Sequence, residues 1–295
     1  MPTQRARPSS GPSRAARFLA FPPTRVVLAA VVVVLPVVLT MDVVHLALAK
    51  SMRVVWPHLL SAALCVSAYR IYVRRVEKRA VSELASSHAW KELGTGLLVG
   101  GLLLVATVGT VAALGRYGVS GRNEWTALLT PLAPLILAVV LEEILFRGVL
   151  FRIVEQSLGS WIALSMSAVL FALAHLSNAG VTVLAIGNTA MAGVLFAAAF
   201  MATRRLWLPM GIHFSWNFLL DAVFSVPVSG HPSSGLLRSA LAGPDWLSGG
   251  AYGVEASVVA LAVISVASVY FVALARRRGH VVLPFWQTAH VPGRG

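Results

Sequence analysis

Residues 127–151 read ALLTPLAPLILAVVLEEILFRGVLF, an apolar run with two adjacent carboxylates and an arginine near its end. A helix needs about 20 apolar residues to cross a bilayer. An ionisable group in hydrocarbon costs roughly 2.5–3.5 kcal/mol on insertion scales, so such groups usually face the protein interior or a wet cavity. The run therefore predicts a membrane helix that brings Glu142, Glu143 and Arg147 to an internal site.

The spacing within this run separates the two carboxylates. Glu143 and Arg147 are four residues apart, the distance at which an ion pair forms on one face of a helix. Glu142 points about 100° away from Glu143 around the helix axis. Glu143 and Arg147 are therefore expected to support the site as an ion pair, and Glu142 is free for chemistry.

The composition of the chain also indicates a membrane protein. Of its 295 residues, 57% are hydrophobic and 12% are charged. The net charge of +13 comes from short basic clusters between apolar runs, the pattern of membrane topology, so nucleic acid is not an expected partner. Cys65 is the single cysteine and lies in an apolar run, which excludes a disulfide framework and a thiolate metal cage.

The whole pattern predicts an all-α, polytopic membrane protein with about eight transmembrane helices in one domain, residues 26–275. The candidate spans are residues 26–49, 54–73, 93–115, 127–151, 161–177, 181–202, 206–226 and 254–275. A disordered basic arm (1–25) and a basic tail (276–295) flank them. With the N-terminus inside, all but five of the 24 Lys and Arg residues fall on the inner side. We therefore expect a multi-pass protein of the cell membrane with both termini in the cytoplasm.

Two connections are long enough to be interpreted. Residues 74–92 carry both Glu and Lys, which suggests an amphipathic helix on the cytoplasmic surface. Residues 227–253 are rich in Pro, Gly and Ser, which favours an irregular outer loop.

Other polar residues interrupt later apolar runs. His175 lies in the fifth candidate span. In the seventh, His213 and Asn217 share one face of the helix. Asp221 lies one turn further along the same face, and we expect a structural role for it. Because a helix rises ~1.5 Å per residue, Glu142 and His213 come out roughly 10–14 Å into the membrane, and His175 nearer ~20 Å. With a tilt or a later start of the fifth span, the four groups are candidates for one pocket in the cytoplasmic half of the membrane.

A carboxylate with two histidines permits two kinds of chemistry. In the first, Glu142 takes a proton from water that His175 helps to hold, and His213 and Asn217 donate to the oxyanion of a peptide carbonyl. In the second, His175, His213 and a carboxylate bind Zn²⁺ and leave a position open for water. The residues alone leave the cofactor as none or zinc.

The chain resembles the CAAX protease and bacteriocin-processing (CPBP, or ABI) family of intramembrane proteases over residues 125–225. Three motifs carry the resemblance, in order and each in its own apolar run: Glu142-Glu143-x-x-x-Arg147, Phe171-x-x-x-His175 and His213-x-x-x-Asn217. The resemblance implies a membrane-embedded endopeptidase, labelled a metalloprotease in the family. The depth count and the charge pattern predict that its pocket opens to the cytoplasm.

The resemblance also implies a role for each matched residue. Glu142 would be the catalytic base, His175 would position the water, and His213 and Asn217 would stabilise the transition state. The substrate would be a peptide or protein, lipid-modified or membrane-bound. Two other classes stay open: a non-catalytic membrane scaffold of the same fold, and a transporter whose Glu and His residues relay protons.

Overall fold

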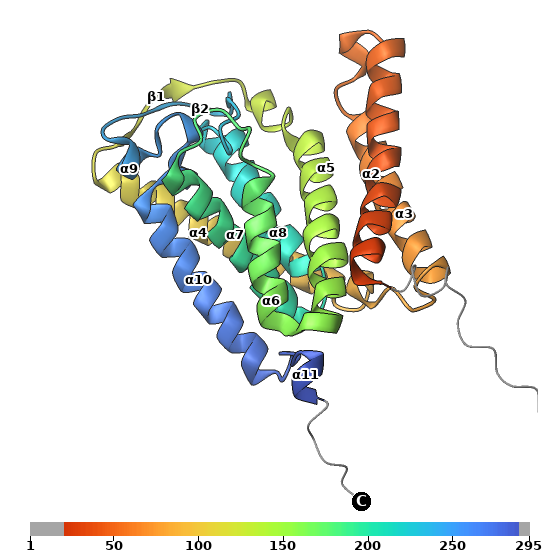
Figure 1. Cartoon of the computed structure of the whole chain (residues 1–295). Coiled ribbons are helices and arrows are strands. Elements are labelled where there is room, and N and C mark those ends of the chain that lie inside the picture. The colour runs from red at the N-terminus through yellow and green to blue at the C-terminus, as the bar shows by residue number, and fades with distance from the viewer. Residues whose placement is uncertain (1–20, 289–295) are drawn as a thin grey trace, which may run out of the picture.

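The structure, a computed structural model, describes residues 21–288 and is almost entirely helical (Figure 1). The all-α prediction is confirmed. The long helical segments match the eight expected spans in order. They are α2 (Pro22–Ala47), α3 (Trp56–Arg75), α4 (Ala89–Ala113), α5 (Leu132–Glu143) with the π-helical η4 (Ile144–Phe151), α6 (Arg152–Leu173), α7 (Val183–Thr203), α8 (Trp207–Phe218) with the π-helical η5 (Leu219–Phe224), and α10 (Val258–Arg277).

The surface of these helices is suited to lipid. Within residues 21–288, five helical stretches are long and apolar enough to cross a membrane: 22–47, 89–113, 125–173, 183–203 and 258–277. The third of them contains α5, η4 and α6, and a non-helical turn at Gly159, with φ of 78°, divides α6 into two helices. Large apolar side chains such as Leu46, Val266 and Val269 are mostly exposed on α2 and α10. Because soluble proteins rarely expose apolar surface on this scale, the chain is a multi-pass membrane protein.

The two ends of the helical bundle differ. α2 begins and α10 ends at the same end of the bundle, and the short strands β1 (Tyr117–Arg122) and β2 (Leu237–Leu241) lie at the other end (Figure 1). Arg25 is in the first turn of α2, Arg277 is the last residue of α10, and Arg204 donates to the carbonyl oxygen of His280 just beyond α10, so all three lie at the end where α2 begins. This arrangement agrees with the predicted charge asymmetry, and the orientation in the cell stays a prediction.

The expected terminal segments lie partly outside the described residues. Residues 1–20 of the arm and 289–295 of the tail lie outside the residues that the structure describes. The remainder of the arm is helical from Pro22 onward, because two prolines occupy the first helical positions, where the missing N–H groups cost nothing. In the tail, Arg276 and Arg277 belong to the last turn of α10, and a short helix α11 (Phe285–Thr288) follows.

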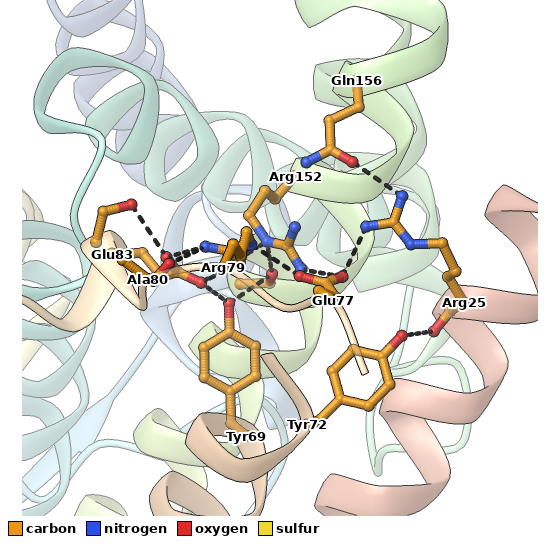
Figure 2. Close-up of polar contacts among 11 residues, drawn as sticks. Arg25, Tyr69, Tyr72, Glu77, Arg79, Ala80, Glu83, Arg152 and Gln156 are labelled. Atoms are coloured by element: carbon orange, nitrogen blue, oxygen red, sulfur yellow. Dashed lines mark hydrogen bonds and ion pairs between the residues drawn. The ribbon is translucent and has the colours of Figure 1, made fainter. Parts of the chain in front are cut away.

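The prediction of an amphipathic surface helix at 74–92 was wrong. α3 ends at Arg75, α4 begins at Ala89, and between them only the short η2 (Ser82–Leu84) is helical. Glu77 and Glu83 turn inward to a group of arginines (Figure 2). Ion pairs with distant helices therefore replaced the local helical pattern.

The segment 227–253 is not wholly irregular. Its strand β2 pairs with β1 in antiparallel register, from Tyr117 opposite Leu241 to Arg122 opposite Leu237, with an irregularity between Val119 and Gly121. The short helix α9 (Asp245–Ser248) and the single turns η6 (Gly250–Tyr252) and η7 (Val254–Ala256) follow it. Pairing with a strand more than a hundred residues away leaves no local signal in the sequence.

Glycines bring α4 and α8 into backbone contact. A Cβ on Gly96 would lie 2.4 Å from the carbonyl oxygen of Leu208, and one on Gly100 would lie 2.3 Å from that of Ile212. Gly211 faces α4 in the same way, 2.5 Å from the carbonyl oxygen of Leu93. Small residues four apart permit such close approach of membrane helices. The contact places α8, with His213 and Asn217, against α4.

Candidate active site

A cavity of about 270 Å³ lies between α5, α7 and α8 and the loops at the β1–β2 end of the bundle. All four residues predicted to be catalytic line it: Glu142, His175, His213 and Asn217. They come from the end of α5, the turn after α6, and α8. Residues separated by up to 75 positions are thus brought to one pocket.

The two adjacent glutamates have different environments. Glu143 is fully buried, whereas the side chain of Glu142 is 28% exposed and lines the cavity. Both end α5, and the chain continues directly into the π-helical η4. π-helical turns are rare and occur frequently at functional sites. A second one, η5, directly follows the helix of His213 and Asn217.

Glu143 and Arg147 form the expected ion pair. Arg147 Nη1 donates to Glu143 Oε1 at 3.0 Å, and both side chains are fully buried. Arg147 Nη2 also donates to the carbonyl oxygen of Gly193 on α7, at 3.1 Å. The guanidinium lies 4.7 Å from the ring centroid of Phe171 and 5.1 Å from that of Phe196. The pair therefore connects the end of α5 to α6 and α7.

His213 is held between the two glutamates. Its Nδ1 lies 2.9 Å from Glu143 Oε1, and its Nε2 lies 3.8 Å from Glu142 Oε2. The ring stacks on Phe196 with centroids 4.4 Å apart. Because a carboxylate only accepts hydrogen bonds, Nδ1 carries the proton, and Nε2 is the atom turned to Glu142.

His175 lies in the turn just after α6, which ends at Leu173, rather than within the helix. Its Nδ1 is 2.8 Å from the carbonyl oxygen of Phe171. A carbonyl oxygen accepts, so Nδ1–H donates and the lone pair of a neutral ring is on Nε2. The tautomer leaves Nε2 of His175 available to a ligand in the cavity.

The residues do not form a metal-ligand set. Within residues 21–288, no group of three or more His, Cys, Asp or Glu side chains could hold a metal ion. The Nδ1 atoms of His175 and His213 are both engaged by oxygen atoms of the protein, which is also the usual state of a metal-binding histidine and leaves each Nε2 atom as the possible ligand. His175, His213 and a carboxylate are thus not assembled as a zinc site among the described residues, and we derive no step through a metal.

The sequence interpretation missed other polar residues of the cavity. Asp221, for which a structural role was expected, lines the cavity. Asn188 of α7 and His231, in the loop after η5, also line it. Glu255 also lines it, from η7 just before α10. In the sequence, Glu255 is marked only by its place at the start of an apolar run, and that feature alone does not indicate a functional role.

The lining also shows which end of the bundle the cavity reaches. Val228, Ser229 and His231 follow η5 toward the β1–β2 end, and Glu255 precedes α10 there. With both termini in the cytoplasm, as predicted, this end would be the outer one. The expectation of a pocket open to the cytoplasm is not supported by this lining.

The fold and the site together define a multi-pass helical membrane protein with an internal pocket of carboxylate, imidazole and amide groups. Residues 124–219 match the family model Rce1-like, described as type II CAAX prenyl endopeptidase Rce1-like. The matched region carries all three motifs, so the match supports the CAAX protease-like (CPBP) assignment that the motifs predicted. The family is one of proteases, which supports a hydrolase that acts on a peptide or protein. Searches of curated proteins and of solved structures gave no significant match.

Proposed function

We propose that the protein is an intramembrane endopeptidase that hydrolyses a peptide bond with water activated by Glu142. The observation that carries the proposal is the convergence of Glu142, His175, His213 and Asn217 on one cavity. Each comes from a motif of the family whose model matches this region. The substrate would be a membrane-bound or lipid-modified peptide or protein.

Glu142 is the proposed general base. Its Oε2 is buried without a hydrogen-bond partner among the described residues, so it can accept a proton from a water molecule in the cavity. Nε2 of His175 accepts a hydrogen bond from the same water and orients it. Glu143 cannot substitute, because it is fully buried and is not among the residues that line the cavity.

His213 and Asn217 are the proposed oxyanion donors. They are four residues apart on α8 and line the cavity together. The amide of Asn217 donates from Nδ2, and His213 donates from Nε2 in its imidazolium form. Donors fixed before the reaction cost no reorganisation when the oxyanion forms.

These residues account for every proton and bond in the proposed hydrolysis. The water oxygen bonds to the carbonyl carbon while Glu142 takes a water proton, and the carbonyl oxygen becomes the oxyanion. The C–N bond then breaks, and Glu142 passes the proton to the leaving amine. The products are a carboxylic acid and an amine, and Glu142 is again ionised.

The test compares purified wild type with Glu142→Gln and His175→Ala in detergent. The substrates are quenched peptides, both prenylated and plain, and zinc is measured on the same samples. Glu124→Gln is the matched control, because Glu124 is exposed before α5 and distant from the motifs in sequence. We expect cleavage by wild type and the control, and a loss of about 10²-fold or more in the two variants.

Folded wild-type protein that cleaves no peptide, with variants that behave like wild type in cells, would favour the scaffold over the protease. Proton-coupled flux in sealed vesicles without cleavage would favour the transporter. Stoichiometric zinc that is lost in His175→Ala would contradict the metal-free mechanism and leave the peptidase standing.

A further inference from the structure

The cavity is lined by acidic groups in a strongly basic protein. Asp and Glu number 11 in the whole chain, against 24 Lys and Arg. Three of these carboxylates line the cavity, from Glu142, Asp221 and Glu255. Among the described residues, none that lines it is Lys or Arg. Asp221 and Glu255 lie beyond residue 219, where the family match ends.

Glu255 is fixed in position by hydrogen-bond donors. Trp216 Nε1 donates to its Oε1 at 2.8 Å, and the backbone N–H and hydroxyl of Ser229 donate to its Oε2 at 2.5 and 3.1 Å. Trp216 directly precedes Asn217 on α8, and Glu255 also interacts electrostatically with His175. These donors hold Glu255 against the proposed catalytic residues, whereas burial outweighs them and raises the pKa of Glu255. A cation bound in the cavity would favour its carboxylate form.

Asn188 adds an independent sign of a ligand. Its Nδ2 donates to the carbonyl oxygens of Glu255, at 2.5 Å, and Ser257, at 2.8 Å. This fixes the amide orientation, because a flipped amide would set its oxygen against two carbonyl oxygens. Its Oδ1 then has no partner among residues 21–288, although the residue is only 2% exposed and lines the cavity. A buried unsatisfied acceptor costs free energy unless a donor reaches it.

We propose, on the basis of the endopeptidase function above, that the substrate carries a Lys or Arg side chain close to the cleaved bond. Asp221, Glu255 and Asn188 bind its charged head in the cavity. An ammonium or guanidinium supplies donors only, and these three residues supply acceptors. A free C-terminal carboxylate in the same space meets three carboxylates and no fixed cation, so such a substrate is disfavoured.

The test uses quenched peptides that are identical except for one residue beside the cleaved bond: Lys, norleucine or Glu. Each is made with a C-terminal acid and with a C-terminal amide. For wild type we expect kcat/KM of the Lys peptide to exceed that of the norleucine peptide by about tenfold or more. Asp221→Asn and Glu255→Gln should each lower this ratio toward one while the norleucine peptide is still cleaved. Equal rates for Lys, norleucine and Glu peptides overturn the proposal.

A binding measurement keeps the test separate from catalysis. Labelled Lys and norleucine peptides are titrated onto Glu142→Gln, which lacks the proposed base, in the presence and absence of the Glu255→Gln change. A tighter Kd for the Lys peptide that depends on Glu255 supports the cationic subsite, even if wild type cleaves nothing and the endopeptidase proposal fails. Equal Kd values for the two peptides contradict the subsite, whatever the cleavage result.

Discussion

At the scale of single residues, adjacent carboxylates are given different tasks by their neighbours. Glu143 is fully buried and compensated by Arg147, so it acts as a fixed anchor for His213. Glu142 lines the cavity and has an oxygen without a hydrogen-bond partner among the described residues. This division follows from the direction in which each side chain leaves the end of α5.

Glu143→Gln should destabilise the protein. The substitution leaves the guanidinium of Arg147 buried without a counter-charge, and breaking a buried pair costs roughly 3–5 kcal/mol. The measurement is thermal unfolding in detergent, with Glu124→Gln as the control. The double variant Glu143→Gln/Arg147→Met should recover much of the loss, because no buried charge is left. A double variant as unstable as the sum of both singles would show that the two residues do not act as a pair.

At the scale of helices, the site depends on how closely α4 and α8 pack. α8 carries His213 and Asn217, and its backbone touches α4 at Gly96 and Gly100. Ser215 Oγ also donates to the carbonyl oxygen of Leu97 at 2.7 Å. A change on α4, outside the three motifs, therefore acts on the site through the position of α8.

Gly100→Val tests this contact. Its Cβ would lie 2.3 Å from the carbonyl oxygen of Ile212, so the two helices must separate. We expect about 1–3 kcal/mol lower stability and a marked fall in peptide cleavage. The matched control is Gly109→Val on the same helix, where nothing lies within 4 Å of an added Cβ. Equal behaviour of the two variants would mean that the helix contact does not govern the site.

At the scale of the whole molecule, a cluster of charged side chains connects α2 and the segment after α3 to α6 (Figure 2). Glu77 Oε1 accepts from Arg25 of α2 at 2.7 Å and from Arg152 of α6 at 2.9 Å. Glu83 accepts from Arg79, and from the hydroxyl of Tyr69 on α3. Segments up to 127 positions apart thus meet at the end of the bundle where α2 begins.

This cluster predicts acid sensitivity. Burial by itself would raise the pKa of Glu77 and of Glu83. The surrounding hydrogen bonds and positive charges together, led by Arg152 at Glu77 and by Arg79 at Glu83, outweigh burial and hold each pKa below its ordinary value. A lowered pKa contributes stability that is present above the unfolded-state value, about 4.3, and is lost as pH falls through the folded-state value.

The melting temperature should therefore fall on acidification below about pH 4.3. Glu77→Gln and Glu83→Gln should melt at a lower temperature at neutral pH and show a weaker fall in acid. Thermal melting in detergent across pH checks this. The same pH slope in wild type and both variants would exclude these carboxylates as the cause.

Topology can be measured with engineered cysteines in a Cys65→Ala background. Val119 is 52% exposed on β1, and Arg277 is exposed at the end of α10. A membrane-impermeant maleimide should label Val119→Cys in intact cells and Arg277→Cys only after permeabilisation. The reverse pattern would put the β1–β2 end, which the cavity reaches, in the cytoplasm and overturn the charge-based orientation.

Local patterns predicted well those features that are local in origin. Apolar runs predicted the eight helical segments, because each run is one helix whose backbone hydrogen bonds are internal. Residues 74–92 were misjudged because Glu77 pairs with Arg25 and Arg152, and Glu83 also lies near Arg152, on other segments. The β1–β2 pair was missed because its two strands are distant in the sequence.

The sequence by itself determined the helical membrane class, the three motifs and the Glu143–Arg147 pair, because all of these depend on hydropathy and on spacing within one helix. The tertiary structure decided that Glu142 and the motif residues of α6 and α8 share one cavity. It also decided that Asn188, Asp221 and Glu255 join them and that the cavity reaches the β1–β2 end. The physical reason is that these features depend on which helices pack together, and contacts between distant segments leave no period in the sequence that could be recognised.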